Sequence, residues 1–361
     1  MTSEERLARR LGVQVQELTS LGEQILSDLD PEELGISWWS PDVPPRPRIL
    51  IGDYLFQAVW STQRNLSEAK LHMLEAQQGL DAEDKRFQTS RFSDVREGVL
   101  FQRPTSAIDE LPDLITDIHI AGFFRACASA LDCLAAMVIG ILPVEEEIIK
   151  ADWGRVGRRL TDLARGSDDV RANMARRIMD EIAAAGPSAW IRWLLDMRNM
   201  YVHRSRILNI RTTQQSGPAI FVSMRRAYLP ARIVGLLPRF PSHSDIQVIK
   251  GTPRLDAACL AESCETTMEG IMESVLHVIS ATTRILTQVW DDRKSGRVRL
   301  PQPHEKQWRL GDQLPSDAFS GYAQRPVNLQ LDYLVLHPNT HRRYLAAALS
   351  DETKSRWDDF A

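Results

Sequence analysis

The chain has 361 residues, of which 43% are hydrophobic and 25% are charged. These fractions are near the average for soluble proteins, so the chain can form one large domain or two modest ones. Its formal net charge of −4 gives no overall indication of a nucleic-acid partner. The amino terminus lacks the apolar stretch of a signal peptide, and the longest apolar run, residues 134–142, is far shorter than the roughly 20 residues that span a bilayer. We therefore expect a cytoplasmic protein that has no contact with a membrane.

The amino-terminal part is expected to be helical on both sides of a proline-rich linker. Thr2-Ser3-Glu4-Glu5 has the pattern of a capping box, which predicts a helix that runs to about residue 29. Paired tryptophans and the prolines of residues 40–48 then indicate an ordered linker. A second helix is predicted over residues 52–80, and residues 81–110, which are charged and broken, are expected to be flexible or to face a partner. The apolar positions of the second helix are Leu55, Val59, Leu66, Leu71 and Leu74.

Residues 123–137 are mainly apolar and predict a long core helix. Asp132 lies within it, where a charge is costly unless it has a partner. One interpretation gives Asp132 a structural partner, either Arg125 in an ion pair or the backbone of a helix end. The other has Asp132 reach across the bundle to orient Arg198 or His203. The structural interpretation is the more common one for a buried acid.

The four cysteines favour a reducing environment. Cys127, Cys133, Cys259 and Cys264 form no C-x-x-C pair and fall in segments that are expected to be helical. We therefore expect reduced thiols in the core rather than a zinc site or disulfide bonds.

The periodicity changes after residue 206. Residues 207–210 and 219–224 predict a β-hairpin, and helix is expected again from residue 255 to about residue 290. The tail contains a strand-like segment at residues 329–336 and a short helix at residues 341–349.

These elements predict a mainly α fold with three parts along the chain. Residues 1–50 form an N-terminal helix and a proline-rich linker. Residues 51–295 form a helical bundle with a small β-hairpin insertion at about residues 207–250. Residues 296–361 form a short mixed C-terminal element.

The segment Arg198-Asn199-Met200-Tyr201-Val202-His203 carries the residues best suited to chemistry. A helix turns about 100° per residue, so Arg198, Asn199 and His203 point away from an apolar stripe on the same helix. Asn199 and His203 are four residues apart, so the side-chain amide can reach the imidazole and hold one tautomer. The apolar stripe consists of Trp190, Leu194, Met197 and Tyr201.

These residue types suit RNA cleavage by attack of the 2′-hydroxyl on its own phosphate. His203 can accept or donate the proton, because the unperturbed pKa of histidine is near neutrality. The Arg198 guanidinium can hold two oxygens of the pentacovalent phosphorane in a planar fork. This chemistry needs no metal or other cofactor. It predicts fragments with 2′,3′-cyclic phosphate and 5′-hydroxyl ends, and no cleavage of DNA.

The Arg-polar-x3-His pattern resembles the motif of the HEPN domain family, whose members are helical and often act as metal-independent ribonucleases. The wider context is also similar, since Ala130-Leu131-Asp132-Cys133-Leu134 resembles the Ala-Leu-Asp-x-Leu core of one HEPN branch. The resemblance covers about residues 120–206, with weaker support from the final helix at 255–290. It implies a HEPN-like helical bundle in which Arg198, His203 and Asn199 form the catalytic site of an endoribonuclease.

The resemblance also implies partners. HEPN ribonucleases typically place their motifs face to face across a two-fold axis, so we expect a homodimer with a composite active site. The family association further points to a bacterial RNA-targeting toxin or phage-defence effector, which an antitoxin or activator protein would control.

An arginine-rich stretch begins at the motif and indicates an RNA-binding surface. Residues 197–244 contain no Asp or Glu but eight arginines. Arginine suits phosphate forks and base stacking, so we expect Arg204, Arg206 and Arg211 to face RNA. Alternatively, some of these arginines pair with acidic segments such as residues 145–147.

Two other classes of function fit the same residues. A non-catalytic HEPN-like module would bind RNA or a partner protein through the same surface, and a cleavage assay with a His203→Ala variant separates it from the enzyme. A helical interaction protein without a nucleic-acid role would show no salt-dependent RNA binding, which the other two classes require.

Overall fold

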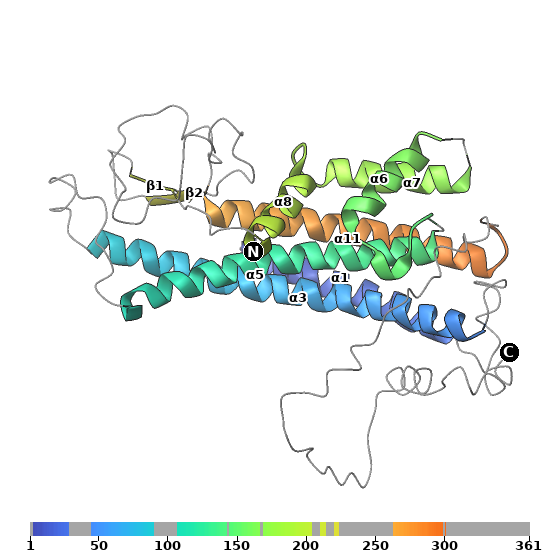
Figure 1. Ribbon diagram of the computed structural model, residues 1–361, viewed down its shortest axis with the longest axis horizontal. Helices are drawn as coiled ribbons and strands as arrows, with labels where there is room; N and C mark the ends of the chain where they lie inside the picture. The colour runs from blue at the N-terminus through green and yellow to red at the C-terminus, as the bar shows by residue number, and fades with distance from the viewer. Residues whose placement is uncertain are drawn as a thin grey trace, which may run out of the picture. The chain divides into compact units, whose positions relative to one another are not determined.

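The computed structural model describes residues 3–28, 45–89, 107–142, 144–166, 169–203, 210–213, 220–223, 263–298 and 300. These residues are mainly helical, as the sequence predicts (Figure 1). The helices are α1 (Ser3–Asp28), α3 (Pro45–Thr89), α5 (Ala107–Ile141), the 3₁₀ helix η2 (Ile148–Lys150), α6 (Trp153–Ala164), α7 (Val170–Ala184), α8 (Trp190–His203) and α11 (Cys264–Lys294).

The chain folds into two compact units. Unit 1 comprises Met1–Gly12, Gln63–Leu131 and Asp180–Ile279, and unit 2 comprises Val13–Thr62, Asp132–Met179 and Ser280–Ala361. Among the described helices, α1, α3, α5, α7 and α11 contribute residues to both units, whereas α8 belongs to unit 1 and α6 to unit 2. This division runs through helices, so boundaries at residues 50 and 295 stay predictions.

In unit 1, α3 and α5 pack against each other and run antiparallel. His72 of α3 contacts His119 of α5, and Glu68, one turn earlier on α3, contacts Arg125, further along α5. The helix α11 joins them through Gln77, whose Nε2 donates to Glu269 Oε1 at 3.1 Å. The fully buried side chains of this core include Leu66, Met73, Leu80, Phe123 and Phe124.

In unit 2, α11 is anchored to α1 and to the end of α5. The buried Asp28 accepts a hydrogen bond from Trp290 Nε1 at 2.8 Å and pairs with Lys294. Arg293 Nη1 donates to the Ile141 carbonyl at 2.8 Å, and so binds a carbonyl of the last turn of α5, which has no partner within the helix. Burial lowers the pKa of Arg293 to about 10, which leaves it charged near neutral pH.

The prediction of a first helix that runs to about residue 29 is confirmed, since α1 ends at Asp28. The second helix is longer than predicted at both ends. It begins at Pro45, within the segment expected to be a linker, because proline is tolerated in the first turn of a helix. It continues to Thr89, and α5 begins at Ala107. The expectation of a broken segment over residues 81–110 is therefore wrong for residues 81–89 and 107–110, which are helical.

Most apolar positions predicted for the second helix face the core. Leu55, Val59 and Leu66 are 0%, 1% and 0% exposed, and Leu74 is half-buried. Leu71, in contrast, is 56% exposed. The helical repeat explains the difference, because the buried face passes through Ala69, Met73 and Ala76 and leaves position 71 outside it.

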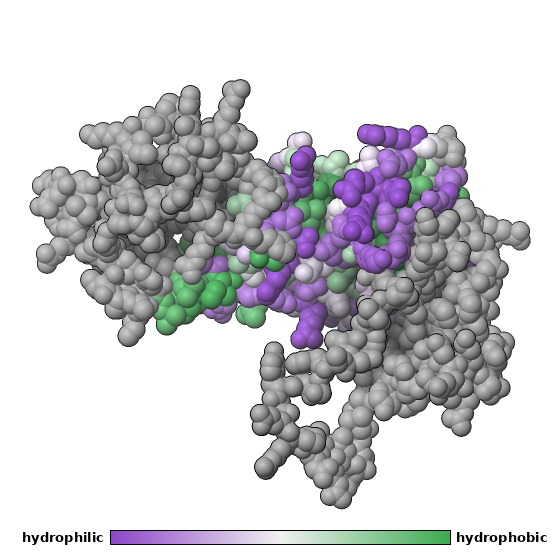
Figure 2. Space-filling view, viewed as in Figure 1, coloured by the Kyte–Doolittle hydropathy of each residue, from purple (hydrophilic) through white to green (hydrophobic). Residues whose placement is uncertain are grey.

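By length and hydropathy alone, residues Leu114–Ile141 of α5 are long and apolar enough to cross a membrane. The uninterrupted apolar run at residues 134–142 is shorter and does not reveal this. Of the most apolar 18-residue window, 78% is buried inside the protein, as in a core helix. The amino-terminal part of α5 differs, because Leu111, Ile115 and Ile118 are about half exposed and follow one helical face. Hydrophobic side chains reach the surface in this area (Figure 2).

Two short strands follow the motif helix. Strands β1 (Ile210–Thr213) and β2 (Ile220–Ser223) pair antiparallel, with Ile210 opposite Ser223. The strand predicted at residues 207–210 overlaps β1 only at its last residue. The connection at residues 214–219, the start of the helix predicted from residue 255 and the tail beyond residue 300 lie outside the described residues, so the predicted hairpin insertion and C-terminal element stay predictions.

The described cysteines are free thiols, as predicted. Cys127 and Cys264 are buried and Cys133 is half-buried, and burial raises the pKa of the Cys127 thiol far above its usual value. Cys127 is thus held in its neutral form. Cys259 lies outside the described residues.

Candidate functional site

A tight turn fixes the start of the motif helix. Ser274 Oγ of α11 donates to the Ala185 carbonyl at 2.8 Å, and Trp190 Nε1 donates to the Ile182 carbonyl at 3.2 Å. Gly186 lies between these two side chains, and a Cβ atom there would lie 2.7 Å from Ser274 Oγ. A larger residue at position 186 would have to displace one of these side chains, so glycine fits this turn best, and α8 begins at Trp190.

The predicted apolar stripe of α8 is confirmed. Trp190, Leu194 and Met197 are 7%, 0% and 0% exposed. Tyr201 continues the stripe, and its ring stacks on Phe124 of α5 with centroids 5.7 Å apart and planes inclined by 15°. This stripe fixes the rotation of α8 about its own axis, so it also decides which way the motif residues face.

Phe124 holds the second half of the motif helix. Its ring packs edge to face with Trp193, with centroids 5.6 Å apart and planes inclined by 74°, and stacks on Tyr201, so two aromatic side chains of α8 contact one side chain of α5. Burial raises the pKa of Tyr201 well above its usual value, and Cys264 and Asp117 contribute to the shift. Reasoning from the sequence placed Phe124 in a core helix but gave it no role. The adjacent aromatic pair Phe123-Phe124 was the available signal.

The motif residues occupy the last two turns of α8. Arg198 and Asn199 are both half-buried, and the Nε atom of Arg198 is fully buried, so the prediction that they point away from the stripe stays a prediction. The backbone is helical through His203, one turn after Asn199, whereas the side chain of His203 lies outside the described residues. Arg204 and Arg206 also lie outside, and Arg211 is described only as part of the backbone of β1.

Asp132 has the structural partner that one interpretation predicted. Its Oδ1 accepts a hydrogen bond from the backbone N–H of Trp153, the first residue of α6, at 2.8 Å. The side chain is half-buried rather than fully buried. The alternative partner, Arg125, lies 3.5 Å from Glu68 instead. Asp132 therefore fastens the start of α6 to α5.

The acidic segment at residues 145–147 has cationic partners close by. Arg159 Nε lies 2.9 Å from Glu146 Oε1, which raises the pKa of that guanidinium, and Lys150 Nζ lies 2.7 Å from Glu147 Oε2. Glu146 and Glu147 therefore have cationic partners without the arginines that follow the motif.

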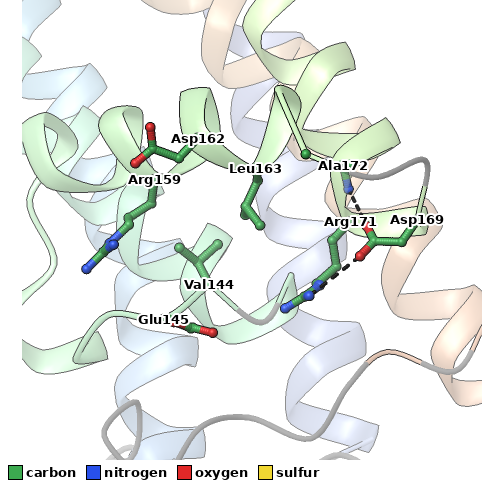
Figure 3. A pocket seen from close by; sticks show the side chains of 9 residues that line it. Val144, Glu145, Arg159, Asp162, Leu163, Asp169, Arg171 and Ala172 are labelled. Atoms are coloured by element: carbon green, nitrogen blue, oxygen red, sulfur yellow. Dashed lines mark hydrogen bonds and ion pairs between the residues drawn. The ribbon is translucent and has the colours of Figure 1, made fainter.

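A hollow of about 290 Å³ opens beside this segment in unit 2 (Figure 3). Arg171 Nη2 lies 3.5 Å from Asp169 Oδ2, and Asp169 Oδ1 accepts the Ala172 N–H at 2.7 Å. That backbone hydrogen bond lowers the pKa of Asp169. Both acidic and basic side chains line the hollow, and none of its lining residues is a predicted site residue. The lining residues are Val144, Glu145, Arg159, Asp162, Leu163, Gly166, Asp169, Arg171 and Ala172.

Within the described part of the chain, no group of three or more His, Cys, Asp or Glu side chains is arranged to hold a metal ion. Comparison of the chain with protein-family models, with curated proteins and with solved structures finds no match. The resemblance to the HEPN family thus rests on the motif, the Ala-Leu-Asp-x-Leu segment and their helical setting.

Proposed function

We propose that this chain is a metal-independent endoribonuclease of the HEPN type. The observation that carries the proposal is the setting of the motif at the end of α8. The apolar side of this helix is buried, whereas Arg198 and Asn199 lie outside the apolar stripe and are partly exposed, with the Nε atom of Arg198 buried. A helix whose rotation is fixed by packing can present a guanidinium and an imidazole to a substrate with little loss of conformational freedom.

In this proposal each motif residue has one task. His203 takes the proton of the attacking 2′-hydroxyl or gives one to the leaving 5′-oxygen. Asn199, one turn earlier, holds the imidazole in one orientation. Arg198 stabilises the negative charge that develops on the phosphorane oxygens. The bond between phosphorus and the 5′-oxygen breaks as the 2′-oxygen bonds to phosphorus, which leaves a 2′,3′-cyclic phosphate and a 5′-hydroxyl.

The proposal includes partners. A two-fold homodimer would bring two copies of the motif together in one composite site. Arg204, Arg206 and Arg211 would bind RNA phosphates beside it. The family association favours a toxin or phage-defence effector of the bacterial cytoplasm, held inactive by an antitoxin or released by an activator.

The experiment is RNA cleavage by variants that differ in one motif residue. His203→Ala and Arg198→Ala should each lower the cleavage rate by about 100-fold or more, because they remove proton transfer and charge stabilisation in the transition state. His277→Ala and Arg158→Ala are matched controls, since both residues are accessible and lie outside the motif. Circular dichroism should show the same helix content in all five proteins.

A different outcome identifies the alternative. RNA binding that weakens as salt rises, without cleavage by the folded wild-type protein, favours a non-catalytic RNA-binding module. Equal cleavage by wild type, His203→Ala and Arg198→Ala would contradict the proposed site.

A further inference from the structure

Two histidines face each other between α3 and α5 in unit 1. Nδ1 of His72 lies 3.0 Å from Nδ1 of His119, and the ring centroids are 5.2 Å apart. This separation is that of a hydrogen bond between two imidazoles, which requires one nitrogen to donate and the other to accept. The pair is therefore intact only while one of the two facing nitrogens is unprotonated.

The surroundings indicate which nitrogen donates. His72 Nε2 lies 3.6 Å from Glu68 Oε1, and Arg125 Nη2 lies 3.5 Å from the same oxygen. A proton on His72 Nε2 points at the Glu68 carboxylate, which leaves His72 Nδ1 as the acceptor. His119 Nδ1–H then donates to it. Among the described residues, the charged side chains that act on His72 are Glu68 and Arg125, so one negative and one positive charge face it.

The His72 ring packs closely against α5. Gly122 of α5 lies against the His72 ring, and a Cβ atom at this position would lie 2.5 Å from Cε1 and Nε2 of the imidazole. The side chain of His72 is only 17% exposed. The His72 ring therefore packs closely against the backbone of α5 at Gly122, and a change in its position would disturb the contact between α3 and α5.

We propose that the His72–His119 pair is a proton-operated switch that loosens the packing of α3 on α5 when the protein is acidified. The first added proton is shared in an imidazolium–imidazole hydrogen bond. The second proton sets two N–H groups and two positive charges against each other at 3.0 Å, and the hydrogen bond is lost. In the part of the chain that the structure describes, no group of three or more His, Cys, Asp or Glu side chains is arranged to hold a metal ion, so we assign the proton to this pair.

The direction of the effect follows from linkage. Burial lowers the pKa of His72 from its usual 6.5, and the neighbouring His119 lowers it further. The unfolded chain therefore binds the proton before the folded chain does. The stability supplied by this site is complete above about pH 6.5 and is lost progressively as the pH falls below it.

The switch is placed to act on the motif helix. His119 lies on α5 slightly more than one turn before Phe124, whose ring holds Tyr201 of α8. Movement of this part of α5 would disturb the aromatic contact that fixes α8. Only this consequence for catalysis rests on the proposed function, because the loosening itself depends on the His72–His119 pair and the residues around it.

Urea unfolding in EDTA at pH 7.5, 6.0 and 5.0 tests the switch. The unfolding midpoint of the wild type should fall on acidification, and His72→Gln and His119→Gln should each reduce that fall by at least half. His277→Gln is the control, because His277 belongs to the same unit but pairs with Glu181. Amide hydrogen exchange of residues 114–124, corrected for the intrinsic rate, should accelerate at pH 5.0 in the wild type and not in His119→Gln.

An equal loss of stability in the wild type and in both glutamine variants would overturn the proposal. If neither variant folds, ring NMR of the wild type decides, because a coupled pair titrates in two separated steps and independent histidines titrate near 6.5. Absence of RNA cleavage at every pH would count against the proposed function and would leave the stability result unaffected.

Discussion

At the scale of single residues, Asp132 shows how a carboxylate in an apolar helix can serve structure. It accepts the first backbone N–H of α6, a group that has no partner within its own helix. Asp132→Ala should lower the free energy of unfolding by about 1 kcal/mol, as for the loss of a capping residue, and Asp132→Asn should lower it less. Urea unfolding measures both. A fall in RNA cleavage without a fall in stability would instead support a role for Asp132 in orienting the motif.

Tyr201 should make the protein sensitive to alkali. Burial raises its pKa above the usual 10.0, so the unfolded chain loses the phenolic proton first. Its contribution to stability is therefore complete below pH 10.0 and declines above it. Tyr201→Phe should lose less stability between pH 9 and pH 11 than the wild type does. Tyr54, whose pKa burial also raises, is present in both proteins and cancels in the comparison. An identical alkaline loss in both would contradict this assignment.

At the scale of elements, the close approach of α3 and α5 depends on Gly122. Gly122→Ala would drive a methyl group into the His72 ring, and overpacking of this kind costs about 1 to 3 kcal/mol. Gly270→Ala is the matched control in α11, because a Cβ atom at position 270 would have no neighbour within 4 Å and alanine favours helix. Thermal unfolding should thus separate the two variants. Equal stability of both would show that α3 and α5 do not approach this closely in solution.

Element boundaries and partners differ in how far the sequence predicts them. The spacing of Leu194, Met197 and Tyr201 predicts the buried side of α8, because burial follows the helical repeat within one element. The start of α3 at Pro45 was missed, because proline both breaks and begins helices. The contacts of Phe124 and His72 could not be predicted, since they join segments far apart in the chain and depend on how helices pack. The partial burial of Arg198 and Asn199 could not be predicted, because it depends on the side chains that pack beside α8.

At the scale of the whole molecule, the proposed composite site requires two chains. Light scattering after size-exclusion chromatography should give twice the mass of one chain, because a two-fold dimer supplies two copies of the motif to one substrate. Mixing an inactive His203→Ala chain with wild type should then lower the activity per wild-type chain. A monomer that cleaves RNA at full rate would contradict the composite site. It would not contradict the catalytic role proposed for the motif residues.

The most direct test of the central claim reads the ends of RNA fragments. Total bacterial RNA is incubated in EDTA with the wild type, with His203→Ala and with the control His277→Ala, and the fragment ends are then sequenced. The wild type and His277→Ala should produce 2′,3′-cyclic phosphate and 5′-hydroxyl ends that are missing with His203→Ala. Fragments with 3′-hydroxyl and 5′-phosphate ends, or the same ends with and without His203, would contradict cleavage by 2′-hydroxyl attack at this helix end.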